Sequence, residues 1–145
     1  MDFMTAMDVA ASGLSAERKH MNLISMNLAN IQTTRTQDGT PYQRKQAIFR
    51  AAPVEWPFNE VMNSELSQEV KGVKLARVEE EDRPYKEVYD PEHPDANDEG
   101  YVQMPDINVV EEMANMLTAS RVYEANLSSI STVKNMLNQA LQIGR

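Results

Sequence analysis

The residues most suggestive of chemistry form the stretch DANDEGYVQMPD at positions 95–106. Oxygen-bearing and turn residues stand at the spacing of an EF-hand calcium loop, namely at Asp95, Asn97, Glu99, Gly100 and Asp106. The prolines of the preceding segment 90–94 forbid the incoming helix of an EF-hand, and the twelfth residue is Asp instead of the longer Glu. We therefore interpret the stretch as a polar turn that leads into a strand, and we expect no bound metal.

Other reactive side chains are scattered. His20 and His93 are far apart in the chain without local ligand spacing. No nucleophile elbow, phosphate loop or dinucleotide fingerprint is present. The carboxylates of the run 79–82 are typical of a solvated face. We expect no catalytic or cofactor-binding residue, and no cofactor; the chain is not expected to be an enzyme.

Composition narrows the class of protein. The chain has 145 residues, enough for one domain, with 41% hydrophobic and 25% charged residues. A net charge of −8 argues against binding to nucleic acid or to an anionic membrane. The sequence has no cysteine and no apolar run long enough to insert directly into a membrane. Its start, MDFMTAMDVAASG, does not resemble a cleaved signal peptide, so we expect any export to use another route.

Prolines and charge divide the chain into three segments. All seven prolines lie within residues 37–105, which carry a net charge of −7, whereas 1–36 is neutral and 106–145 carries −1. The pattern predicts an N-terminal helix, an acidic insert and a C-terminal helix. The expected fold is mainly α: the two long terminal helices pair as an antiparallel coiled coil, and a small irregular β-containing insert joins them.

The expected seam of the helix pair follows from spacings of three and four residues. The N-terminal helix should run from about Thr5 to Ile31, and its seam residues are Met7, Leu14, Met21, Ile24, Leu28 and Ile31. Asn108 and Glu111 form a capping box that starts the C-terminal helix near Val109, and Gly144 is a stop signal. The seam of that helix is Val109, Met113, Met116, Tyr123, Leu127, Ile130, Leu137 and Leu141.

Each helix also has apolar residues on its other side. At about 100° per residue, these second-side residues are Leu23 and Met26, interleaved with Asn22, Asn27 and Asn30, and on the C-terminal helix Val122, Val133, Met136 and Ile143. A single small chain should supply only one layer of neighbours, so the pattern favours contacts between subunits. An alternative is a soluble homodimeric coiled-coil adaptor or export chaperone that uses only one seam.

The insert should contain short strands. Ala47 and Phe49 suggest one strand face, Val73 and Leu75 another, and the stretch 85–89 a third. The stretch 53–70 has no clean period.

Both terminal segments resemble bacterial flagellar axial proteins, the rod and hook family. SGLSAERKHMNLISMNLANIQTT (12–34) is similar to the N-terminal signature, whose core residues here are Asn27, Ala29, Asn30 and Thr33. MLTASRVYEANLSSISTVKNMLNQALQIGR (116–145) is similar to the C-terminal helix, with Arg121, Tyr123, Glu124, Ala125 and Asn126 at its centre. DGTPYQRKQAIFR, GVKLARV and the stretch 88–113 resemble proximal rod members. Distal rod and hook relatives usually continue with Pro-Gly, where this chain has TRTQDG.

The resemblance implies a structural subunit of the flagellar basal body. Such subunits assemble helically into a rod that transmits torque from the membrane ring to the hook, forms part of the export channel and is required for motility. The implied partners are copies of the chain, other proximal and distal rod proteins, the ring–rod junction protein and the flagellar type III export apparatus. The implied location is the periplasm, reached without a cleaved signal peptide.

Overall fold

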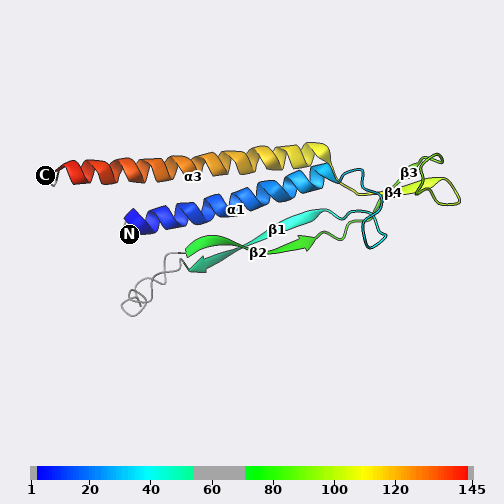
Figure 1. Cartoon of the computed structure of the whole chain (residues 1–145), viewed down its shortest axis with the longest axis horizontal. Helices are drawn as coiled ribbons and strands as arrows, with labels where there is room; N and C mark the ends of the chain where they lie inside the picture. Colours follow the sequence, from blue (N-terminus) through cyan, green and yellow to red (C-terminus); the bar gives the residue numbers. More distant parts are fainter. Residues whose placement is uncertain (1–2, 54–70, 144–145) are drawn as a thin grey trace.

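Two long helices dominate the molecule (Figure 1). The computed structural model describes residues 3–53 and 71–143, so the expectations for most of 53–70 and for the stop at residue 144 lie outside the described residues. The elements in chain order are α1 (Phe3–Ala29), β1 (Lys45–Pro53), β2 (Lys71–Glu80), β3 (Lys86–Tyr89), β4 (Tyr101–Met104) and α3 (Val109–Ile143). Two terminal helices around a small antiparallel β insert agree with the predicted mainly α class.

Helix α1 is the middle layer of the molecule. It runs antiparallel to α3 on one side and carries the β1–β2 hairpin on the other (Figure 1). The β3–β4 ribbon lies beyond the ends of both helices, opposite to the chain termini (Figure 1). The helices therefore pair as expected in direction, while the supercoiled packing of a coiled coil stays a proposal.

Two contacts define the register of the helix pair. The Asn27 amide meets the Glu112 carboxylate, and a Cβ placed on Gly13 would meet the Asn126 side chain. The two contacts are fourteen positions apart on both helices (13 to 27 and 112 to 126), which is the regular register of an antiparallel pair. Since α3 has 35 residues and α1 has 27, α3 is longer by roughly 12 Å and extends past the start of α1 (Figure 1).

Side-chain caps explain where the helices begin and end. The Oδ1 atom of Asn108 accepts the backbone N–H of Val110 at 3.0 Å and that of Glu111 at 3.5 Å, which confirms the predicted start of α3. Helix α1 ends at Ala29, two residues before the predicted Ile31. At this end the backbone and side-chain N–H groups of Asn30 both donate to the carbonyl of Met26, one of the carbonyls of the last turn.

In its described residues, 37–53 and 71–105, the insert forms two separate antiparallel ribbons. In the first, β1 pairs with β2, Phe49 lies opposite Leu75, and a register shift follows Ile48. In the second, β3 pairs with β4. The strands expected around Phe49, Leu75 and Tyr89 are confirmed.

The calcium-like stretch is a turn leading into β4. The Oδ1 atom of Asn97 accepts the backbone N–H groups of Glu99 and Tyr101, and Gly100 has a φ of 84° that suits a residue without a side chain. Asp95 accepts a hydrogen bond from the Thr34 hydroxyl at 2.8 Å. The expected polar turn is confirmed. Among the described residues, no group of three His, Cys, Asp or Glu side chains is placed to hold a metal ion.

Candidate functional site: a polar junction and the outer face of α3

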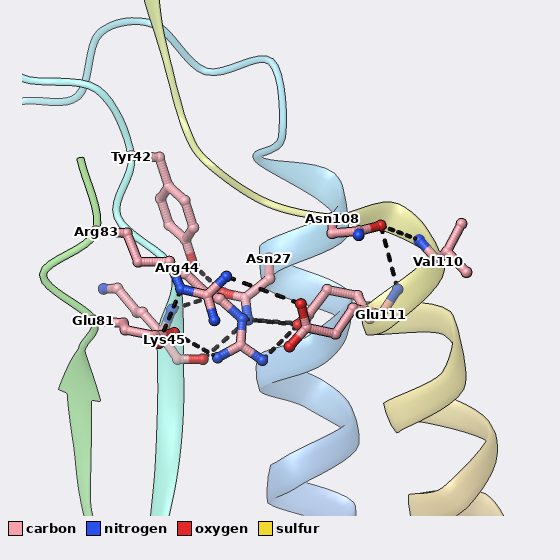
Figure 2. Close-up of polar contacts among 10 residues, drawn as sticks. Asn27, Tyr42, Arg44, Lys45, Glu81, Arg83, Asn108, Val110 and Glu111 are labelled. Atoms are coloured by element: carbon pink, nitrogen blue, oxygen red, sulfur yellow. Dashed lines mark hydrogen bonds and ion pairs between the residues drawn. The ribbon is translucent and has the colours of Figure 1, made fainter. Parts of the chain in front are cut away.

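The Asn27 carboxamide lies where α1, the start of β1 and the first turn of α3 meet (Figure 2). Its Nδ2 donates to the backbone carbonyl of Lys45 at 2.9 Å and to the Glu112 carboxylate at 3.0 Å. Its Oδ1 accepts the Lys45 backbone N–H at 2.9 Å and the Tyr42 hydroxyl at 3.0 Å. Both donors and both acceptor positions of the amide are therefore used, and the residue is only 1% exposed.

The two bonds to Lys45 show how α1 holds the hairpin. Asn27 bonds both the N–H and the C=O of one residue at the edge of β1, as a neighbouring strand would. An aspartate at position 27 has no N–H to give to Lys45 or to Glu112. The site therefore selects a carboxamide.

Arg44 joins the junction to Glu81, the residue that follows β2. Its guanidinium, 12% exposed, donates through Nε and Nη2 to Glu112 at 2.8 and 2.6 Å, and through Nη1 to Glu81 at 2.8 Å. Glu81 also accepts from Arg83 at 2.9 Å. We call Asn27, Tyr42, Arg44, Lys45, Glu81 and Glu112 the polar junction. It ties the first turn of α3 to the base of both strands of the hairpin.

The charges of the junction shift the pKa values of its members. Burial lowers the pKa of Arg44, but the bonds to Glu112 and Glu81 outweigh burial and raise it overall. Burial raises the pKa of Glu81, yet the guanidinium groups of Arg83 and Arg44 lower it overall. For Tyr42, burial is the main cause of a raised pKa, and the nearby carboxylates add to it. The ionised forms of Arg44 and Glu81 are therefore the favoured ones.

Three of the four N-terminal motif residues make contacts within the chain. Asn27 is the centre of the junction, and Asn30, directly after α1, donates its side-chain N–H to the Met26 carbonyl. Thr33 donates its hydroxyl to the Asn30 side chain, and its carbonyl accepts the backbone N–H of Tyr42. These contacts turn the chain from α1 toward β1.

Burial corrects part of the predicted contact surface between subunits. Leu23 and Asn27, expected to face neighbours, are buried within the chain. The physical reason is that the β1–β2 hairpin covers a second side of α1, a layer that the prediction assigned to another subunit. Met26 and Asn22 are exposed and Asn30 is half-buried, so their contact with neighbouring subunits stays a prediction.

The predicted seam of α3 also needs correction. Four of its residues are between 43 and 65% exposed: Val109, Met113, Leu127 and Leu141. Met116, Tyr123, Ile130 and Leu137 are half-buried, as is Val133, which was expected on the other side. The most buried residues of α3 are Glu112 and Ala119. On α1, Ile24 is buried, and the other predicted seam residues, Met7, Leu14, Met21, Leu28 and Ile31, are half-buried. The contact of α3 is therefore centred on a carboxylate and a small residue, which a search for large apolar residues does not select.

The side of α3 that points away from α1 carries an apolar stripe, which we call the outer stripe. It consists of Val110, Met113 and Leu117, which are 75, 61 and 54% exposed. Their spacing of three and four residues places them on one side of the helix. Arg121 and Glu124 of the C-terminal motif follow on the same side and are exposed, and within the described part of the chain neither makes an ion pair.

Sequence patterns missed Glu112 and Arg44. The capping box draws attention to Glu111, the neighbour of Glu112, and Arg44 is 68 positions away from its partner. The only sequence signal that could have indicated Glu112 was a polar residue on a helix side whose other contact residues are apolar.

In the residues that the structure describes, neither helix is long and apolar enough to cross a membrane.

Comparison with known proteins identifies the class. Residues 7–36 match the family model "Flagella basal body rod protein", and residues 98–143 match "Flagellar basal body rod FlgEFG protein C-terminal". The two matched segments contain all of the N-terminal motif and all of α3.

Curated relatives narrow the class to one kind of rod protein. The flagellar basal-body rod protein FlgC of Borreliella burgdorferi is 41% identical over 99% of this chain and 98% of the relative. FlgC of Bacillus subtilis is 38% identical over 97% of both chains, and FlgC of Salmonella typhimurium is 40% identical over the full length of both. The chain belongs to the FlgC family of flagellar basal-body rod proteins. Such proteins are structural components, so the chain is not an enzyme, and the alternative of a soluble dimeric adaptor is set aside.

Proposed function

We propose that this structural subunit of the flagellar basal-body rod builds the proximal part of the rod, and that the outer stripe of α3 contacts a neighbouring subunit. The exposure of Val110, Met113 and Leu117 carries the proposal. Three large apolar side chains on one side of a helix are costly in water when they form a continuous patch, and such patches mark interaction sites. In a helical assembly every subunit has neighbours that can cover them.

The long overhang of α3 supports further contacts. Ile143 is 87% exposed and Leu141 is 65% exposed at the end of α3 that extends past α1. Of the residues predicted to face other subunits, Met26, Val122 and Met136 are also exposed, between 41 and 45%. We propose that neighbours cover these residues as well.

The finer assignments remain proposals. Similarity to FlgC proteins over nearly the whole chain supports a proximal position in the rod. We propose as partners other copies of the chain, proximal and distal rod proteins, and the ring–rod junction protein. The proposal also includes passage through the type III export apparatus into the periplasm without a cleaved signal peptide. It further includes torque transmission and lining of the export channel. The segments 1–36, 37–105 and 106–145 are its proposed structural units.

The test is a double substitution in the outer stripe, Met113→Lys with Leu117→Lys. Two lysines buried at a subunit contact would be unpaired charges, so we expect the variant to be exported normally but to enter basal bodies at less than about a tenth of the wild-type amount. The measurement is the amount of the chain in purified basal bodies relative to the exported amount.

Asn115→Lys with Thr118→Lys is the matched control. Neither residue is three or four positions from a member of the outer stripe, so both lie off that side of the same turns of α3. Asn115 is half-buried and Thr118 is exposed, and the control adds the same charge. Incorporation of the stripe variant at the level of the control would show that the outer stripe is not a subunit contact.

A further inference from the structure

The polar junction connects two parts of the molecule that have little other contact. Helix α3 packs on α1, and the β1–β2 hairpin packs on α1, each as a separate layer (Figure 1). Further along the helices an open groove of about 660 Å³ separates them, lined on one side by Val122 of α3 and on the other by Val73 of β2. The charged contact through Glu112 and Arg44 is therefore the principal bond between α3 and the base of the hairpin.

Neither α3 nor the β1–β2 hairpin can supply all of the hydrogen-bond partners of the polar junction without the other. If the first turn of α3 moves away, Glu112 leaves with it, and the Arg44 guanidinium loses two of its hydrogen bonds. At the same time one N–H of Asn27 loses its acceptor. If instead the hairpin moves away, Arg44 leaves, and the fully buried Glu112 carboxylate loses its ion pair. Leaving a buried charge unpaired is among the most costly changes in a protein interior.

The hairpin has further attachments to α1. Phe49 of β1 meets the His20 ring edge-on, with the ring centroids 5.5 Å apart. At the end of β2 nearer to the chain termini, the backbone N–H of Val73 donates to the Ser12 hydroxyl at 3.0 Å. Neither contact involves α3, so the junction is the part of the attachment that the hairpin shares with α3.

We propose that the polar junction is a coupling device: attachment of the first turn of α3 to α1 and attachment of the β1–β2 hairpin to α1 strengthen each other through Glu112, Arg44 and Asn27. Such coupling is reciprocal by linkage. Any contact that holds or loosens the start of α3 changes the attachment of the hairpin on the other side of the molecule. The inference concerns a single chain, so it holds or fails independently of the proposed assembly.

The experiment separates this coupling from general unfolding by fixing α3 to α1 away from the junction. The chain has no cysteine, so Gly13→Cys with Asn126→Cys introduces one disulfide where a Cβ on Gly13 would lie 3.3 Å from the Asn126 Cγ. In this cross-linked full-length chain, amide hydrogen exchange is measured for β1, β2 and the middle of α1, with Glu112→Gln as the test and Glu111→Gln as the control. Glu111 is exposed at the rim of the same network, 3.9 Å from Arg83.

We expect exchange in β1 and β2 to rise at least about tenfold in Glu112→Gln, because hydrogen bonds to charged groups are the strong ones. Exchange in the middle of α1 should stay unchanged, and Glu111→Gln should behave like the parent. Unchanged exchange in the hairpin of Glu112→Gln overturns the proposal. An equal rise in α1 overturns it too, because the effect is then loss of overall stability.

In the chain without the cross-link, Arg44→Gln tests the reverse direction. Exchange in the first turns of α3 should rise by about the same factor as exchange in the hairpin. A rise confined to the hairpin would contradict reciprocal coupling.

Discussion

The two sides of the first turns of α3 have opposite character. On the side that faces α1, Glu112 is fully buried, whereas Val110 and Met113, within two residues of it, point outward and are mostly exposed. A surface helix of a globular protein normally shows the reverse arrangement, with apolar residues inward and charged residues outward.

The difference shows that the inward side of α3 fixes the arrangement of the elements within the chain, whereas the outward side is free to contact another molecule. Glu112 is stable inside because Arg44 and Asn27 supply three hydrogen bonds to its carboxylate. Such directional bonds define one orientation of the hairpin, which apolar packing alone defines less sharply. Among the residues that the structure describes, the outer stripe has no directional partner, and its apolar area is available to a neighbour.

The largest effect is expected from removing one member of the buried ion pair. Glu112→Leu leaves the Arg44 guanidinium without its main partner and should lower the free energy of unfolding by about 3–5 kcal/mol. The double variant Glu112→Leu with Arg44→Met removes both charges and should recover most of that loss. Chemical unfolding of the full-length chain, followed by circular dichroism, measures both. A loss below about 1 kcal/mol in the single variant would mean that the pair behaves like a surface ion pair.

Asn27→Asp should produce the next largest effect. The new carboxylate lies next to that of Glu112, where the parent has a hydrogen bond of 3.0 Å, and it cannot donate to the Lys45 carbonyl. We expect a loss of about 2–4 kcal/mol, from one unsatisfied carbonyl and one repulsive pair. Asn22→Asp makes the same chemical change at an exposed position of α1 and should cost less than about 0.5 kcal/mol. Equal losses in the two variants would show that the carboxamide at position 27 has no special role.

The pH dependence of stability tests the charged rim of the junction. The pKa of Glu81 is lowered in the folded chain by Arg83 and Arg44, so its contribution is complete above the ordinary pKa of about 4.3. The contribution is lost as the pH falls through the lowered pKa of the folded state. The free energy of unfolding, measured from about pH 6 to pH 3, should therefore fall less steeply in Glu81→Gln than in the parent. Parallel curves would contradict the role assigned to Glu81.

The smallest effect on the single chain is expected from the outer stripe. Met113→Lys with Leu117→Lys places charges where the side chains already meet water, so the free energy of unfolding should change by less than about 0.5 kcal/mol per site. The same variant is expected to fail in assembly, which makes the contrast with the junction sharp. A large loss of stability in the isolated chain would place the outer stripe among the residues that stabilise the fold.

Local sequence signals determined the elements of this protein. The Asn108 cap set the start of α3, all seven prolines lie between the two helices, and the motif around Asn27 and Asn30 indicated the family. These signals depend on residues close together in the chain, and capping or turn formation is a local interaction. The strands around Phe49 and Leu75 were predictable for the same reason.

Only the tertiary structure decided which side of each helix faces which neighbour. Spacings of three and four residues identify stripes, but the rotation of a helix about its axis depends on the groups that it meets across the contact. For α3 the contact with α1 is centred on Glu112 and Ala119. The Glu112 carboxylate can be buried there because Arg44 and Asn27, 68 and 85 residues away in the chain, supply its hydrogen-bond partners. For α1, Leu23 and Asn27 are buried within the chain, although sequence patterns had assigned them to a contact with another subunit. Contacts between residues so distant in the chain leave no periodic signal in the sequence, so only the tertiary structure identifies them.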